Sequence, residues 1–151
     1  MGAIFDAMCA FFEEDEWTGV AQGRIENTLL PQYQGQNGHW SCIAFAAEEQ
    51  KQFAFYSILP VNVPDDLRGY VAEFMHRLNY GLLIGNFEMD FNDGEIRFKT
   101  SIDVEGGELT FELARNTVYA NVLQFDQYLA TIYAVLHGGL SVEEALAQLG
   151  R

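Results

Sequence analysis

The residues with the greatest potential for chemistry are the acids and amides of segment 90–95, DFNDGE. Such oxygen-rich loops bind calcium when they have the EF-hand spacing, with glycine at the sixth position and glutamate at the twelfth. Counted from Asp90, glycine stands at the fifth position and Ser101 at the twelfth. The segment therefore lacks the calcium pattern. Asp93-Gly94 is better interpreted as the turn of a β-hairpin, since both residues tolerate the positive φ of a type I′ turn.

His39 and Cys42 have the spacing of half a zinc site. A structural zinc ion needs four ligands, and the sequence offers no second pair with suitable spacing. His76 is expected on the polar side of a helix, and His137 at a helix C-terminus, where a cation is favourable. The sequence also lacks a nucleophile elbow, a phosphate-binding loop and a dinucleotide fingerprint. We therefore predict no catalytic residues, metal or cofactor, and we expect that the chain is not an enzyme.

The strands on either side of Asp93-Gly94 can be paired residue by residue from a two-residue turn. One face is then apolar, through the pairs Phe91–Ile96, Met89–Phe98 and Phe87–Thr100. The other face carries opposite charges, through the pairs Asp90–Arg97 and Glu88–Lys99. A shift by one residue would turn every apolar side chain to solvent, so the pattern specifies which face each residue occupies. The acidic cluster is thus explained as part of a sheet.

The charge balance limits the classes of partner. The chain has 22 acidic and 8 basic residues, for a formal net charge of −14, and its bases are scattered along the sequence. Such a surface repels phosphate backbones and anionic lipid headgroups. We therefore expect neither nucleic acid nor a membrane as a partner, whereas a basic or unfolded protein is compatible with the acidity.

Length and cysteine content suggest one domain in a reducing compartment. At 151 residues the chain fits a single domain, residues 1–151, with 49% hydrophobic residues to form its core. No stretch approaches the ~20 apolar residues that span a bilayer, and no secretory signal is visible. Cys9 and Cys42 are expected to be free and buried, which favours the cytoplasm.

The hydrophobic periodicity predicts an α+β fold with the order α-βββ-α-ββ-α-α. Helices are expected over residues 3–14, 64–81 and 109–137, and a short one begins at the capping box 141–144, SVEE. Three strands are expected near 24–30, 39–46 and 52–59, before the two strands of the hairpin. Segment 81–85, GLLIG, is interpreted as a helix stop followed by the start of a strand.

The helix predicted over residues 109–137 has more apolar residues than one buried face requires. Its main stripe runs from Phe111 to Leu136, and a second apolar set lies off that stripe. A helix that is apolar on more than one side must be covered on more than one side. The cover is a neighbouring helix, a second subunit or a bound partner. The candidates for a partner or dimer surface are Leu113, Tyr119, Leu123 and Tyr128.

Several segments resemble the bacterial YbjN-type family. They are FFEEDEW (11–17), YSILPVNVP (56–64), the block 78–110, VYANV (118–122) and HGGLSVEEAL (137–146). The resemblance covers nearly the whole chain and implies the fold of type III secretion chaperones, in which helices pack against a twisted antiparallel sheet, here of about five strands. Those chaperones are small, acidic and usually homodimeric, and they hold an extended segment of a client protein. The family is labelled a sensory transduction regulator and offers no catalytic residues to carry over.

These observations lead to two functional hypotheses. The first is a non-enzymatic protein-binding protein, chaperone-like or an adaptor, that forms a homodimer and binds an unknown protein client. The alternative is a small-ligand-sensing regulator without catalytic activity, in which aromatic residues such as Trp40, Tyr56 and Tyr80 line a pocket. A melting shift with a defined metabolite would support the second hypothesis.

Overall fold

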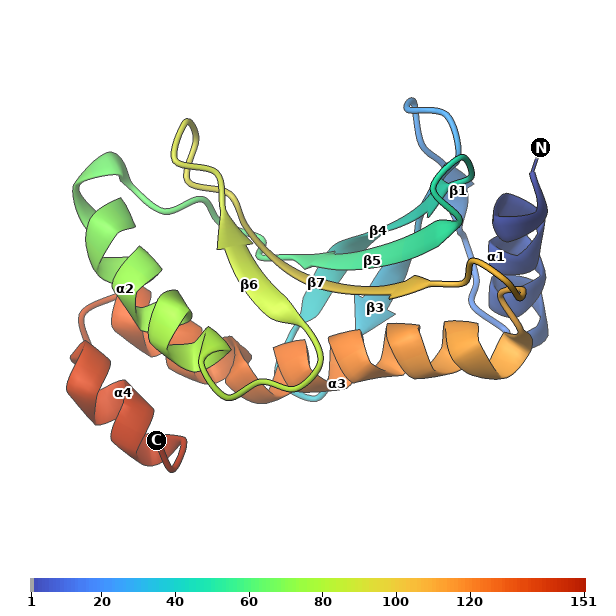
Figure 1. Cartoon of the computed structure of the whole chain (residues 1–151). Coiled ribbons are helices and arrows are strands. Elements are labelled where there is room, and N and C mark those ends of the chain that lie inside the picture. Colours follow the sequence, from blue (N-terminus) through green and yellow to red (C-terminus); the bar gives the residue numbers. More distant parts are fainter. Residues whose placement is uncertain (1) are drawn as a thin grey trace.

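The centre of the molecule is a twisted antiparallel sheet, seen in a computed structural model that describes residues 2–151 (Figure 1). The strands are β1 (Ala21–Gln22), β2 (Thr28–Leu30), β3 (Gln32–Gln34), β4 (His39–Ala47), β5 (Gln52–Ile58), β6 (Asn86–Met89) and β7 (Ile96–Asp103). Their order is β1-β2-β4-β5-β7-β6, and β3 pairs with β4 beyond the end of β2. The predicted α+β class, with helices against an antiparallel sheet, is confirmed.

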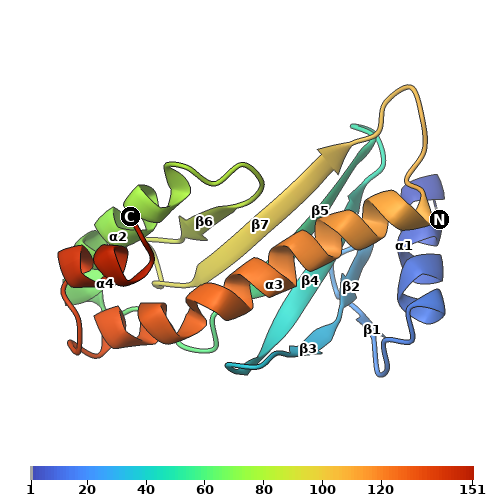
Figure 2. The same ribbon diagram turned by 90° about the horizontal axis from the view of Figure 1, so that it is seen from below.

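The helices cover one face of this sheet and its two ends. They are α1 (Ala3–Glu14), α2 (Arg68–Asn79), α3 (Phe111–Leu136) and α4 (Val142–Gln148), with a 3-10 turn, η1 (Asp65–Leu67), directly before α2. Figures 1 and 2 show α3 running diagonally along the sheet, with α1 at one end and α2 and α4 at the other. No helix of residues 2–151 covers the opposite face, which we call the helix-free face.

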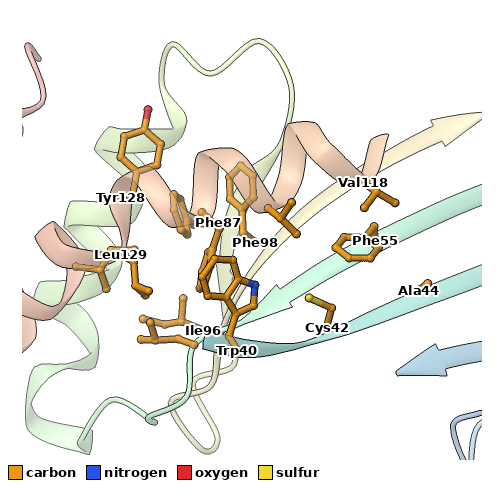
Figure 3. Packing of buried hydrophobic residues seen from close by; sticks show 14 of the residues in the cluster. Trp40, Cys42, Ala44, Phe55, Phe87, Ile96, Phe98, Val118, Tyr128 and Leu129 are labelled. Carbon is orange, nitrogen blue, oxygen red and sulfur yellow. The ribbon is translucent and has the colours of Figure 1, made fainter. Parts of the chain in front are cut away.

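The core lies between α3 and the sheet. Alternate residues of β4, among them Trp40, Cys42 and Ala44, are buried and point toward α3 with Phe55 of β5 (Figure 3). This alternation confirms the predicted strands at these positions. At the end of the sheet, α1 buries the apolar side predicted from its periodicity, Ile4, Phe5, Met8, Phe11 and Phe12.

The sheet has seven strands, against about five predicted, because its first edge is made of short pieces. The single strand expected over residues 24–30 is found as β2, and β1 and β3 flank it. Pro31, which has no N–H to donate, separates β2 from β3. Its carbonyl accepts the Cys42 N–H at 2.8 Å, so the ladder with β4 continues past the proline.

The hairpin has its predicted faces but not its predicted register. Met89 lies opposite Ile96, and Phe87 lies opposite Phe98, two residues from the predicted pairs. The prediction of a two-residue turn is wrong. The loop begins earlier in the chain, at Asp90, whose carbonyl accepts the Gly94 N–H at 2.7 Å. A shift by an even number of residues keeps each strand residue on its face.

Two residues of the hairpin prediction therefore have other roles. Phe91, expected on the apolar face, lies in the loop and is 59% exposed. Asp90, expected opposite Arg97, closes the loop by donating its N–H to the Glu95 carbonyl at 2.9 Å. Glu88 still contacts both bases, Arg97 at 2.8 Å and Lys99 at 2.9 Å, as the charge pattern requires.

The N-termini of α3 and α4 agree with the sequence signals, whereas α2 is shorter at both ends than the predicted 64–81. The Thr110 hydroxyl accepts the Leu113 N–H at 3.1 Å and begins α3, and Ser141 with Glu144 forms the predicted capping box of α4. Pro64, predicted as the first helical residue, instead precedes η1. Among residues 2–151, no helix combines the length and apolarity that crossing a membrane requires.

Candidate protein-binding surfaces

The residues singled out for metal chemistry do not form a site. His39 is exposed, whereas Cys42, three residues further along β4, is buried on the opposite face. Burial raises the pKa of the Cys42 thiol to about 12, so the thiol is protonated at neutral pH. The Asp93 carboxylate accepts the Glu95 N–H at 2.9 Å and thereby shapes the hairpin loop. Within residues 2–151, no three His, Cys, Asp or Glu side chains are placed to hold a metal ion.

The four residues predicted as a partner surface lie on different sides of α3. Tyr128 is only 8% exposed, and its ring lies 6.0 Å from that of Phe87 in an edge-to-face arrangement (Figure 3). Leu113 is half-buried against the core. Tyr119 is also half-buried, and its hydroxyl donates to the Asp15 carboxylate at the end of α1. Leu123, which is 57% exposed, offers a partner the largest free surface of the four.

An exposed apolar segment that sequence reasoning missed follows α2. In residues 80–85, which we call the 80–85 loop, Tyr80 is 88% exposed, Leu83 100% and Ile84 56%. The loop passes beside α3 (Figure 1). There the Gln124 side chain donates to the Ile84 carbonyl at 3.0 Å. The segment was interpreted as the start of a strand, but β6 begins only at Asn86. Its run of three uncharged apolar residues between two glycines is a sequence signal from which an exposed apolar loop could have been predicted.

On another side, α3 borders a groove of about 510 Å³, which we call the β3 groove. It is lined by Tyr33, Gln34, Gly35, Gln36, Asn37, Leu123, Asp126 and Gln127. The buried Asp126 carboxylate accepts the N–H groups of Gln36 and Asn37, at 2.9 and 2.8 Å, and so fixes the turn between β3 and β4. The Tyr33 ring packs between Trp40 and Trp17, with centroids 5.3 and 5.6 Å away. The Tyr33 ring that lines the groove is therefore packed between two indole rings.

Two tyrosines on this side of the molecule, Tyr33 and Tyr119, lie near carboxylates. Burial raises the pKa of Tyr33, and the charge of Asp126 raises it further. Burial, together with the hydrogen bond to Asp15 and that carboxylate's charge, raises the pKa of Tyr119 to about 12. A nearby anion disfavours the phenolate, so the carboxylates beside these two tyrosines contribute to their raised pKa values.

The helix-free face is also apolar, but long side chains of its own cover it. Its apolar residues, Ile43, Phe45, Tyr56 and Ile58, are half-buried. The Arg97 guanidinium lies 4.3 Å above the centre of the Tyr56 ring, where a cation is attracted to the ring face. Glu88 holds Arg97 and Lys99 in place across β6 and β7. This face is thus less open than the 80–85 loop.

The aromatic residues of the ligand-sensing hypothesis do not share a pocket. Trp40 is buried, and its indole N–H donates to the Ser57 hydroxyl at 2.9 Å. Tyr56 lies on the helix-free face, and Tyr80 is almost fully exposed after α2. The structure therefore gives that hypothesis no site built from these three residues.

Comparison with solved structures shows where this fold has been seen. "YbjN, a putative transcription regulator from E. coli" is similar with a TM-score of 0.62 at 14% identity, over 88% of this chain and 92% of that one. A chain of the HopA1–SchA chaperone–effector complex has a TM-score of 0.51 at 14% identity, over 83% of this chain and 92% of its own. A chain of the ExsC–ExsE complex has a TM-score of 0.54 at 15% identity, over 83% of this chain and 89% of its own. The predicted type III secretion chaperone-like fold is confirmed.

Sequence comparison identifies the family. No curated protein matches the chain by sequence. The profile of the YbjN family, described as "Putative bacterial sensory transduction regulator", matches residues 5–134, which is most of the chain. The chain therefore belongs to the YbjN family.

Proposed function

We propose that this chain is a non-enzymatic protein-binding protein, a chaperone-like or adaptor protein that acts as a homodimer. Its family is described as regulatory, and two of its structural neighbours come from complexes of two proteins, one of them a chaperone–effector complex. Regulators and chaperones of these kinds are not catalytic, which supports a role in binding. The free Cys9 and Cys42 thiols favour a reducing compartment, in which we place the protein.

The observation that carries the proposal is the 80–85 loop. Tyr80, Leu83 and Ile84 are exposed within five residues, and contiguous exposed apolar surface marks interaction sites on soluble proteins. The loop has no charged residue in a chain whose net charge is −14. A second copy can approach this neutral surface with less like-charge repulsion than elsewhere. We therefore assign the loop, which the Gln124 side chain joins to α3, to the dimer interface.

Light scattering on the full chain tests this assignment. At micromolar concentration we expect twice the monomer mass of 17.0 kDa. The double variant Leu83→Ser/Ile84→Ser is expected to be a folded monomer, because it removes exposed apolar side chains without touching the core. Phe91→Ser is the matched control, since Phe91 is exposed to a degree similar to Ile84 and lies in the hairpin loop, at the opposite end of β6 from the 80–85 loop (Figure 1). A wild-type monomer, or a double variant that stays dimeric, would contradict the assignment.

A further inference from the structure

The two edges of the sheet differ in whether another strand can join them. At the β6 edge, the Asn79 side chain donates to the Phe87 carbonyl at 3.1 Å and accepts the Phe87 N–H at 2.8 Å. These are the groups that an added strand would use, so this edge is blocked at its centre.

The β3 edge has no such cover. In its ladder with β4, the Cys42 N–H donates to the Pro31 carbonyl and the Gly35 N–H to the Gly38 carbonyl. Hydrogen-bonding direction alternates along an antiparallel strand, so the N–H and C=O groups of Gln32 and Gln34 point away from β4. Among residues 2–151, no hydrogen bond to these four groups is present.

An unfilled strand position therefore lies beside β3. The short β1 pairs with β2 through Ala21 and Leu30, and it stops before it reaches β3 (Figure 2). Preceding residues do not continue along the edge, because the chain turns at Gly19, with φ +66°, and Trp17 packs on Tyr33. An extended segment of another chain can continue the line of β1 along β3.

The two sides of this position select alternating side chains. On the α3 side, Tyr33 and Leu123 line the β3 groove and offer apolar surface. On the other side, Gln32 and Gln34 lie beside Ser41 and His39 of β4, which are polar. Successive residues of a strand point to opposite faces, so an incoming strand would place apolar residues in the groove and polar residues opposite.

The charges around the position select basic residues. The acidic run 13–16, EEDE, ends α1, and its Asp15 accepts the Trp17 indole N–H at 2.9 Å beside Tyr33. Asp126 lines the groove itself, under the turn after β3. A second copy of the chain, with its own net charge of −14, would bring like charge to this position. A cationic segment is therefore favoured over another copy of the chain.

We propose that the β3 edge binds an extended segment of a partner protein, by strand addition, in which apolar residues alternate with lysine or arginine. This inference rests on the proposed protein-binding function and names the site and chemistry of the client. It is separate from the dimer assignment, because the 80–85 loop and the β3 groove lie at different places around α3.

The test uses an array of labelled peptides of about six residues, the length of a typical strand. Each alternates Lys with one of Val, Ile, Leu, Phe, Tyr or Trp, and a matched array replaces Lys by Glu. Fluorescence anisotropy with the full chain is expected to show binding to members of the lysine array only. The outcome that overturns the proposal is no binding to any lysine peptide, or equal binding to the glutamate peptides.

Variants locate the binding. Gln34→Pro removes one outward N–H and leaves the ladder with β4 intact, since proline is tolerated at edge positions. It is expected to weaken binding about tenfold, the loss of roughly one hydrogen bond with its steric cost. Leu123→Glu is expected to weaken the binding of the lysine-array peptides, because their apolar residues would face position 123 in the groove. Leu123→Met is expected to preserve the binding. The control Leu83→Ser/Ile84→Ser is expected to bind peptide like the wild type.

Hydrogen exchange provides a direct readout. The Gln32 and Gln34 amides are expected to exchange fast in the free chain and to become protected when the best lysine peptide is bound. Protection elsewhere, or binding that Gln34→Pro does not change, would overturn the proposal. If Gln34→Pro dissociates the dimer, the occupant is a second copy and the proposal fails. A monomeric wild type that still binds peptide at this edge would contradict only the dimer assignment.

Discussion

Asn79 occupies, with its side chain, the place that a neighbouring strand would take beside Phe87. Its amide donates to the Phe87 carbonyl at 3.1 Å and accepts the Phe87 N–H at 2.8 Å. Exposed edge strands invite pairing with other chains, and proteins protect them in specific ways. Here the last turn of α2 provides the protection at the β6 edge, whereas among residues 2–151 no side chain covers β3 in the same way.

Removing this amide is expected to destabilise the fold and open the edge. Asn79→Ala leaves the Phe87 N–H and C=O without their partner, at a cost of about 1–3 kcal/mol in the free energy of unfolding. Urea denaturation measures the loss, and faster hydrogen exchange at Phe87 locates it. His76→Ala, one turn earlier on the exposed side of α2, is the control and is expected to be near neutral. Equal stability of the two variants would show that the edge is not held by Asn79.

Asn121 joins α3 to the sheet through buried hydrogen bonds. Its amide donates to the carbonyls of Phe55 and Phe98, each at 2.9 Å, and accepts the Ser57 hydroxyl at 2.6 Å. Asn121→Leu leaves these groups buried without this partner, and we expect a loss of about 1–3 kcal/mol for each group left unsatisfied. Asn116→Leu, at an exposed position of the same helix, is the control. Thermal denaturation measures the two stabilities. An equal loss of stability in both variants would contradict this role.

The pKa of Tyr119 makes stability depend on alkaline pH. The folded-state pKa is about 12, above the usual value of 10.0, because of burial and the hydrogen bond to Asp15. The folded state therefore favours the neutral phenol. This contribution is complete below pH about 10 and is lost as the pH rises toward about 12. We expect the wild type to lose more stability across this range than Tyr119→Phe. Parallel curves for the two proteins would refute the assignment.

Glu88 contributes to stability in the opposite pH range. Burial raises its pKa, but the hydrogen bonds and charges of Lys99 and Arg97 outweigh burial and hold the pKa below the usual 4.5. The contribution is therefore complete above pH about 4.5 and is lost as the pH falls through the folded-state pKa.

The matching experiment compares Glu88→Gln with the wild type in urea. At neutral pH we expect a loss of about 0.2–1 kcal/mol for each of the two partly exposed pairs, shrinking in acid and in high salt. Glu95→Gln, nearby in the hairpin and without a salt bridge to Arg97, is the control. A difference that persists unchanged in acid would mean that charge is not the cause.

The sequence predicts those parts of the fold that depend on local patterns. The caps Thr110 and Ser141 and the apolar side of α1 involve residues within a few positions of each other, so their signals are visible in the chain. The hairpin register is different. Its faces follow from alternation, but its pairing depends on how the loop closes, and Asp93-Gly94 permitted a tighter turn than the one formed.

The candidate surfaces were harder to predict, because exposure depends on what packs nearby. Leu123 and Tyr128 have similar apolar character on α3, yet Phe87 of β6 covers Tyr128 and no residue covers most of Leu123. The unfilled strand position beside β3 depends on where β1 ends, and hydrophobic periodicity does not reveal that end. The apolar run of the 80–85 loop was visible, but its exposure was not.

The central claim, that this chain binds another protein and pairs with itself, is tested most directly by affinity capture. The tagged full chain is captured from the cells that produce it, together with its variants, and the bound proteins are quantified by mass spectrometry. We predict untagged copies of the chain and one other protein in stoichiometric amount. Gln34→Pro should lose the other protein but keep the copies, and Leu83→Ser/Ile84→Ser should lose the copies. Recovery of the bait alone would contradict the account.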